Sequence, residues 1–290
     1  MPSDQIQWFP GHMAKTRRLI KENLSSVDVV IELLDARVPK SSENPEFSSL
    51  VGDKPTLILM NKASLADPAA NKKWAEHFAY LGRRVIETDC ITGAGLNKIM
   101  PAINDLLAER IRRYNEKGMS GRKLRAMIVG IPNVGKSSLV NKLSGVKRAK
   151  VEDRPGVTLN KQWVVTNIGL ELLDMPGVLW PKFEDRTVGE NLAATGAIKD
   201  DIVDTEAVAC ALAGRLKKMY PDLLAARYKL DPAMLSDSDI SDYDIFLAIG
   251  KKRGFLISGG EINTERTALT LLDEFRGAKI GRITLDSPDD

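Results

Sequence analysis

The sequence contains very little cysteine and histidine. Its 290 residues include two cysteines, Cys90 and Cys210, and two histidines. Two cysteines cannot form the disulfide framework of a small secreted protein, and no group of Cys and His residues has the spacing of a zinc site. The sequence therefore predicts a protein of a reducing compartment, the cytoplasm.

Long apolar runs are absent as well. No run approaches the ~18 residues that span a bilayer, and the apolar patch at residues 6–9 is too short for the core of a secretory signal. Apolar residues make up 43% and charged residues 28%, as in an ordinary globular protein. We therefore expect a soluble, cytoplasmic protein with no membrane partner, and we expect it to be monomeric when free.

Charge is distributed unevenly along the chain. Residues 1–183 carry 28 basic and 19 acidic side chains, a net charge of +9, whereas residues 184–290 carry 14 and 20, a net charge of −6. Residues 110–125 hold seven basic side chains against Glu116 alone. Such a segment either is a solvated helix face with its linker or contacts a polyanion, of which nucleic acid is the commonest.

Short apolar segments alternate with helical ones over the first part of the chain. Strands are predicted at residues 27–34, 55–60, 84–88, 124–129, 162–166 and 170–173. Helices are predicted at residues 69–81, 96–116 and 136–143, with a linker at residues 117–123. This alternation predicts an α/β fold, with a mostly parallel sheet covered on both faces.

The pattern becomes purely helical in the last third of the chain. The best helical segments are residues 205–220, 243–251 and 264–275. We therefore predict an α/β domain over residues 1–183 and an all-helical domain over residues 184–290.

Residues 130–137 read Gly-Ile-Pro-Asn-Val-Gly-Lys-Ser and match the G-x-x-x-x-G-K-S pattern of a P-loop. The pattern follows a predicted strand and opens a predicted helix, which is the context that a P-loop requires. Backbone N–H groups and the helix N-terminus would surround phosphate oxygens. Lys136 would reach the β- and γ-phosphates as a catalytic residue, and Ser137 would hold Mg²⁺. The segment predicts a P-loop nucleotide hydrolase.

Two later segments add to the predicted magnesium and γ-phosphate site. Asp174 to Gly177 read Asp-Met-Pro-Gly after a predicted strand, so Asp174 could hold Mg²⁺ through water and the Gly177 N–H could point at the γ-phosphate. Thr158 supplies a loop hydroxyl that could complete the coordination of the metal and serve catalysis. Alone, D-x-P-G also occurs in ordinary turns. Its position after the P-loop and Thr158 favours the magnesium interpretation.

The segments that would contact the base precede the P-loop. Residues 61–64 read Asn-Lys-Ala-Ser at the end of a predicted strand and resemble the N-K-x-D element of GTPases, which contacts the guanine ring. Asp89 and Cys90 resemble the last GTPase element, whose backbone touches the base. This order is a circular permutation, which preserves the sheet and the site while moving the termini. The predicted helical domain then follows Gly177 closely, where the nucleotide state can move it.

With these residues the chain resembles the circularly permuted GTPases of the YlqF/RbgA type, the ribosome biogenesis GTPase A family. The resemblance extends beyond general GTPase motifs, to residues 8–15, 35–37, 180–184 and 196–199. It implies a GTPase that uses GTP and Mg²⁺ in late assembly of the large ribosomal subunit, with rRNA as a principal contact. It also implies that residues 184–290 contact RNA or the ribosome.

The resemblance also implies which residues bind the nucleotide. Those near the base would be Asn61, Lys62, Ala63, Ser64, Asp89 and Cys90. Those near the phosphates would be Asn133, Val134, Gly135, Lys136, Ser137, Ser138 and Gly177. The Asn133 side-chain oxygen would also help to hold K⁺, as in related potassium-activated GTPases.

Ser64 departs from the family pattern, which has Asp at that position. A hydroxyl cannot accept the paired hydrogen bonds of the guanine ring as a carboxylate can, so we expect softer base selectivity. Asp67, three residues later, could partly substitute.

The family lacks the glutamine that orients water in Ras-type proteins, and the aliphatic Val178 follows Gly177 here. His12 is a candidate for that catalytic role, with packing or RNA contact as the equal alternative. Two other functions stay open: a nucleotide-gated RNA-binding module with little hydrolysis, and a P-loop ATPase.

Overall fold

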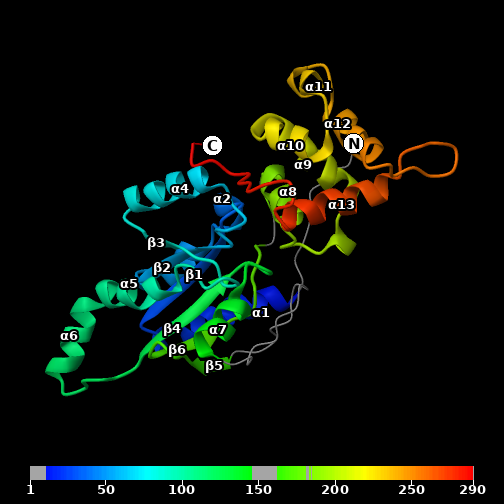
Figure 1. Ribbon diagram of the computed structural model, residues 1–290. Coiled ribbons are helices and arrows are strands. Elements are labelled where there is room, and N and C mark those ends of the chain that lie inside the picture. Colours follow the sequence, from blue (N-terminus) through cyan, green and yellow to red (C-terminus); the bar gives the residue numbers. More distant parts are fainter. Residues whose placement is uncertain (1–10, 146–161, 181–182, 184, 290) are drawn as a thin grey trace.

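The computed structural model describes residues 11–145, 162–180, 183 and 185–289 (Figure 1). A six-stranded sheet with the order β3-β2-β1-β4-β6-β5 lies at the centre of the first part. Its neighbouring strands are parallel except β5, which runs antiparallel to β6. The strands are β1 (Val29–Asp35), β2 (Thr56–Asn61), β3 (Arg84–Glu87), β4 (Leu124–Gly130), β5 (Gln162–Val165) and β6 (Leu170–Asp174). The predicted mostly parallel sheet is confirmed.

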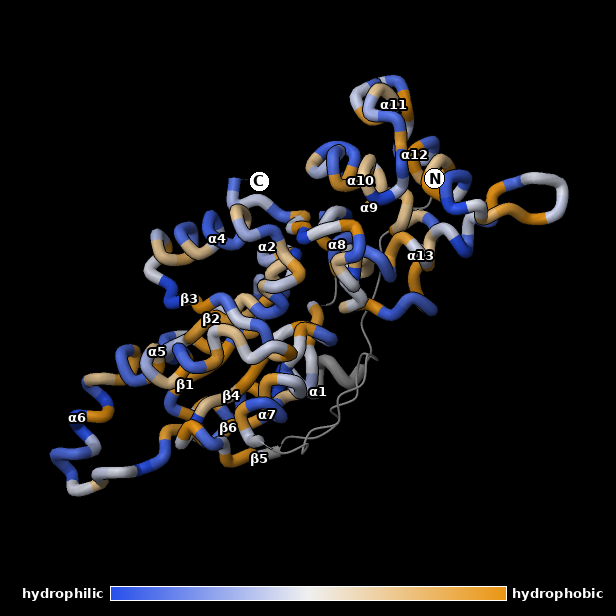
Figure 2. The backbone as a smooth tube through the Cα atoms, in the orientation of Figure 1, coloured by the Kyte–Doolittle hydropathy of each residue, from blue (hydrophilic) through white to orange (hydrophobic). Residues whose placement is uncertain are grey.

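The inner strands are apolar over most of their length because helices cover both faces of the sheet. Every residue of β1 is buried, and Figure 2 shows the central strands as largely hydrophobic segments among more mixed helices. One face packs on α5 (Ile99–Leu106) and α7 (Lys136–Ser144). The other packs on α1 (Gly11–Asn23), α3 (Phe47–Val51) and α4 (Pro68–Tyr80). A short helix, α2 (Pro39–Ser42), follows β1.

The helix predicted over residues 96–116 is broken, which corrects the prediction. A 3₁₀ turn, η2 (Leu96–Lys98), precedes α5, and α6 (Ala108–Glu116) follows it after a break at Leu107. Leu107 is buried in the core, whereas none of the residues of α6 is buried. The helical spacing therefore continued past the point at which the chain leaves the sheet, and α6 projects from the molecule (Figure 1).

The last third of the chain is helical, as predicted, and contains more helices than the sequence indicated. The helices are α8 (Arg186–Ala194), α9 (Thr205–Met219), α10 (Pro221–Tyr228), α11 (Pro232–Ser236), α12 (Asp242–Lys252) and α13 (Thr264–Arg276). The additional ones carry the usual start signals: Asp185 and Asp231 accept N-cap hydrogen bonds, and Pro221 and Pro232 occupy the first turn. The division at residue 183 stays a prediction.

Residues 277–289 return from the helices to the sheet (Figure 1). The Leu285 N–H donates to the Arg37 carbonyl at 2.7 Å, and the Ile283 N–H donates to the Leu65 carbonyl at 3.2 Å. The buried Asp286 carboxylate accepts from Ser41 and from Asn191 of α8. The C-terminal segment thereby ties the loops that follow β1 and β2 to the helical part.

Candidate nucleotide site

The P-loop connects β4 to α7 through a tight turn. Asn133 and Gly135 have positive φ angles of 56° and 109°, so the backbone turns tightly before the first residue of α7. Lys136 is 7% exposed, and its ammonium donates to the Gly130 carbonyl at 3.0 Å and the Ile131 carbonyl at 2.7 Å. Burial lowers the pKa of Lys136 to about 8, although Asp174 opposes the shift.

Asn61 joins three of the predicted nucleotide-binding loops. Its amide Nδ2 donates to the Val134 carbonyl of the P-loop at 2.7 Å, and its Oδ1 accepts from the Cys90 N–H at 3.0 Å. A Cβ on Gly135 would lie 2.3 Å from Asn61 Nδ2, so a side chain there would displace this bond. The loops after β2, β3 and β4 thus form one unit at the carboxyl ends of the strands, where ligands bind to open α/β sheets.

Asp174 and Gly177 approach the P-loop from the carboxyl end of β6. A Cβ on Gly177 would lie 2.8 Å from Pro132 N and 3.0 Å from Lys136 Nζ, so only glycine fits against this loop. Asp174 Oδ1 is buried and has no hydrogen-bond partner among the described residues. Burial raises the pKa of Asp174 to about 6, which Lys136 partly offsets. An orphaned buried carboxylate beside a P-loop is chemically suited to a cation.

Ser64 and Asp89 face one another across the loops after β2 and β3. The Ser64 hydroxyl donates to Asp89 Oδ2, and Asp89 Oδ1 accepts from the N–H groups of Ile91 and Thr92, each at 2.9 Å. Burial alone would raise the pKa of Asp89, but these hydrogen bonds outweigh it and hold the pKa below its usual value. Burial raises the pKa of the neighbouring Cys90 thiol to about 12, so Cys90 is not a reactive thiolate.

Asp67, which could partly have substituted for an acid at position 64, binds other groups instead and does not line the cavity described below. Its carboxylate caps α4 by accepting from the Ala69 N–H at 2.8 Å and also accepts from the Tyr220 hydroxyl at 3.1 Å. Ala63 also contacts other parts of the chain, because its carbonyl accepts from Arg282 and Asn71.

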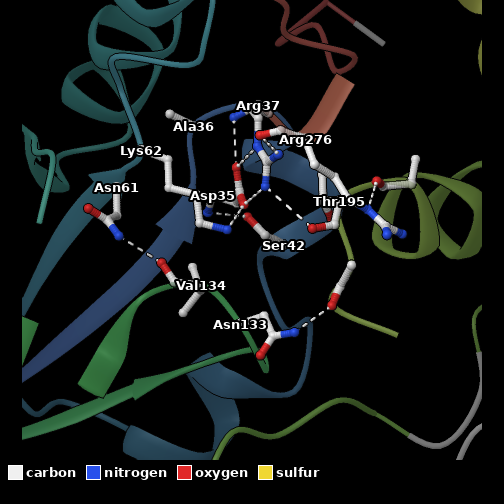
Figure 3. A network of polar contacts seen from close by, with 12 residues as sticks. Asp35, Ala36, Arg37, Ser42, Asn61, Lys62, Asn133, Val134, Thr195 and Arg276 are labelled. Carbon is white, nitrogen blue, oxygen red and sulfur yellow. Dashed lines mark hydrogen bonds and ion pairs between the residues drawn. The ribbon is translucent and has the colours of Figure 1, made fainter. Parts of the chain in front are cut away.

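A buried ion network lies beside the loop that follows β2 (Figure 3). Arg37 is 2% exposed and binds Asp35 through two hydrogen bonds of 2.9 and 2.7 Å, while Lys62 donates to the same carboxylate at 2.9 Å. Burial opposes ionisation of Asp35, but the two cations outweigh it and lower its pKa. Arg37 also donates to the carbonyls of Thr195 and Arg276 in the helical part. Sequence reasoning left the role of residues 35–37 open.

The loops after β2, β3 and β4 and part of the helical region line a cavity of about 1010 Å³. The predicted nucleotide-binding residues that line it are Asn61, Lys62, Ser64, Asp89, Cys90, Asn133, Gly135 and Ser138. Helical-part residues that line it include Thr195, Gly196, Ile198, Lys199, Asp200, Asp273 and Arg276. Asn133 Nδ2 donates to the Gly196 carbonyl at 2.8 Å and so connects the P-loop to that second wall. Sequence reasoning gave these helical residues no place in the site.

The chain is similar to known GTPases over almost its entire length. Ribosome biogenesis GTPase A of Bacillus licheniformis is 46% identical over 285 residues, which cover 98% of this chain and 99% of the relative. That of Priestia megaterium is 46% identical over 286 residues, which cover 98% of each chain. This chain belongs to the ribosome biogenesis GTPase A family.

Comparisons with a family model and with solved structures agree with this assignment. Residues 125–217 match the family described as "50S ribosome-binding GTPase". GNP-bound YlqF from T. maritima is 28% identical with a TM-score of 0.62, over 95% of this chain and 99% of that one. The GDP-bound structure of TM YlqF is 27% identical with a TM-score of 0.65, over 94% of this chain and 100% of that one. The predicted circularly permuted P-loop GTPase fold and GTP hydrolase activity are confirmed.

For two predicted catalytic residues of this GTPase, Thr158 and His12, the structure does not describe the side chain. Thr158 falls in residues 146–161, and His12 is the second residue of α1, where its side chain is not described. Val178 is buried in the core, where its aliphatic side chain cannot orient water. None of the helices in the described part of the chain combines the length and the apolar character of a membrane span.

Proposed function

We propose that this GTPase binds GTP in the 1010 Å³ cavity and uses its hydrolysis in late assembly of the large ribosomal subunit. The observation that carries the proposal is the double wall of that cavity, which GTPase loops and the helical part build together. Because the nucleotide would touch both walls, a change from GTP to GDP would alter how the helical part sits on the GTPase part. The large ribosomal subunit and its rRNA would then bind the GTP form and the GDP form with different affinities.

Magnesium fits the residues on the phosphate side of the site. Ser137 would supply its hydroxyl and Asp174 its orphaned carboxylate, with Thr158 as the further predicted ligand. Among the described residues, no group of three or more His, Cys, Asp or Glu side chains could hold a metal. A site without such a group still suits Mg²⁺, which usually binds through one or two protein groups together with water and nucleotide phosphates. The ion would neutralise charge on the β- and γ-phosphates.

The chain's own residues would then bind and orient the phosphates. The P-loop N–H groups, the N-terminus of α7 and Lys136 supply positive potential where charge develops in phosphoryl transfer. The Gly177 N–H would contact the γ-phosphate, and His12 would position the attacking water. Asn133 would help to hold K⁺ near the phosphates, in place of an arginine finger.

Multiple-turnover hydrolysis with purified large subunits tests this function. We expect GTP turnover to be slow alone, to rise at least several-fold with large subunits, and to be faster in KCl than in NaCl at equal ionic strength. ATP should not replace GTP. GTP binding without any stimulated turnover would instead support a nucleotide-gated binding module, and equal use of ATP would support an ATPase.

A further inference from the structure

The family position that reads guanine with a carboxylate holds Ser64 in this chain. A carboxylate lies beside it: Asp89, from the loop after β3, accepts a hydrogen bond from the Ser64 hydroxyl through its Oδ2. Ser64 and Asp89 both line the cavity, whereas Asp67 does not and is held by α4 and Tyr220. The acid missing from one loop is therefore present on the adjoining loop, in contact with the residue that replaced it.

We propose that Asp89 is the guanine-specifying carboxylate of this GTPase and that Ser64 acts with it as the second acceptor. The proposal deepens the proposed function and rests on GTP binding in the cavity. It moves the specificity-determining acid from the loop after β2 to the loop after β3. The family resemblance gives position 89 a backbone contact with the base, so a side-chain role is new.

The chemistry of the base requires two neighbouring acceptors. Guanine presents the N1–H and the 2-amino group side by side, and a carboxylate normally accepts both. Here Asp89 Oδ2 accepts one hydrogen bond from Ser64 and keeps a further lone-pair direction. The Ser64 hydroxyl donates its hydrogen bond to Asp89, so the lone pairs of its oxygen can accept from a second donor. Together the two oxygens offer the pair of acceptors that one carboxylate would offer.

The loop fixes which oxygen of Asp89 is available. Oδ1 accepts from the N–H groups of Ile91 and Thr92, which leaves Oδ2 on the side of Ser64. The lowered pKa of Asp89 keeps the carboxylate ionised near neutral pH, so it is an acceptor only. Adenine has an acceptor at N1 and no 2-amino group, and a site built to accept two hydrogen bonds rejects it.

The Asp89→Asn variant tests the proposal, because it should bind a xanthine nucleotide more tightly than the unaltered protein does. The N–H groups of Ile91 and Thr92 require an oxygen at the Oδ1 position, so the new amide nitrogen would occupy the Oδ2 position and donate. A donor there opposes guanine but matches xanthine, in which a carbonyl replaces the 2-amino group. We expect GDP affinity to fall about 10- to 100-fold and XDP affinity to rise by about 10-fold.

Calorimetric titration with GDP, XDP and ADP in Mg²⁺ buffer measures the ratio of GDP to XDP affinity. The matched control is Asp67→Asn, a carboxylate outside the cavity, which should leave that ratio unchanged. An unchanged ratio in Asp89→Asn overturns the inference. If Asp89→Asn does not fold, Ser64→Ala applies the same test: it should weaken GDP about 10-fold and leave ADP alone, and unchanged GDP affinity overturns the inference. Absence of GDP binding by the unaltered protein would overturn the proposed function itself.

Discussion

Lys136 is the residue on which phosphate binding should depend most. Its buried ammonium donates to two carbonyls of its own loop, so it is held beside the predicted phosphate position. We expect Lys136→Ala to weaken GTP binding about 10- to 100-fold, because hydrogen bonds to charged groups contribute about 1.5–3 kcal/mol each. The melting temperature should change little, because removing a buried charge offsets the two lost bonds.

Lys142 provides the control on the same helix. Its ammonium donates to the Ile91 carbonyl at 3.3 Å, at the edge of the loop after β3, whereas that of Lys136 donates to P-loop carbonyls. Lys142→Ala should keep nearly full GTP affinity in the same calorimetric titration. Equal affinity of Lys136→Ala and the unaltered protein would show that the P-loop does not bind phosphate.

Individual site residues could be predicted from sequence where a motif fixes both the residue and its spacing. Asn61, Asn133 and Gly135 lie at the cavity because short loops after neighbouring strands must meet at one edge of the sheet. The use of Asp67 could not be predicted, because its partner Tyr220 is 153 residues away in the sequence. Arg37 is a similar case, since its contacts with Thr195 and Arg276 depend on tertiary packing.

At the scale of elements, α13 supports the second wall of the cavity through Arg276. The guanidinium donates to both oxygens of Asp200, at 2.8 and 2.7 Å, and to the carbonyls of Ala193 and Ala194 at the end of α8. We expect Arg276→Ala to destabilise the protein by about 2–4 kcal/mol, because four hydrogen bonds are lost, two of them to backbone carbonyls at the end of α8. GTP affinity should fall several-fold as this wall loosens.

Arg266 lies on the exposed side of the same helix, where it stacks on Phe255, and is the matched control. Arg266→Ala should leave GTP affinity unchanged. Thermal denaturation and calorimetry on both variants separate stability from binding. If Arg276→Ala melts earlier yet binds GTP normally, the helical wall plays no part in nucleotide binding.

Elements with a strong local pattern were predictable, and those defined by packing were not. The buried strands are short and mainly apolar, so the sequence pattern predicts them. The break at Leu107 could not be predicted, because the helical spacing of apolar residues continues past it into α6. α10 and α11 are short and begin with proline, which in a sequence equally indicates a loop.

For the whole molecule, we expect the GTP form to bind the large ribosomal subunit more tightly than the GDP form. The first 183 residues carry +9 and residues 184–290 carry −6, so attraction to RNA phosphates should come mainly from the GTPase part. Affinity should then fall steeply with added salt, as release of counterions requires. Co-sedimentation with a non-hydrolysable GTP analogue, with GDP and without nucleotide, each at two salt concentrations, measures both effects.

The Lys136→Ala variant is the control for that experiment and should sediment with the analogue as it does without nucleotide. Equal co-sedimentation in all three nucleotide states would show that the bound nucleotide does not control binding to the subunit. No co-sedimentation with the large subunit in any state would remove the ribosomal assignment of this chain.

The return of residues 277–289 to the sheet has a consequence for the order of events during synthesis. The P-loop and the loops after β2 and β3 leave the translating ribosome well before two later parts of the chain. These are Asp273, Arg276 and Gly277, which line the cavity, and Asp286, which joins Ser41 to Asn191. Since chains fold from the N-terminus as they emerge, a nascent chain would carry its motifs without the second wall of the site. The completed protein should therefore bind nucleotide tightly, whereas nascent chains that lack the C-terminal residues should bind it weakly.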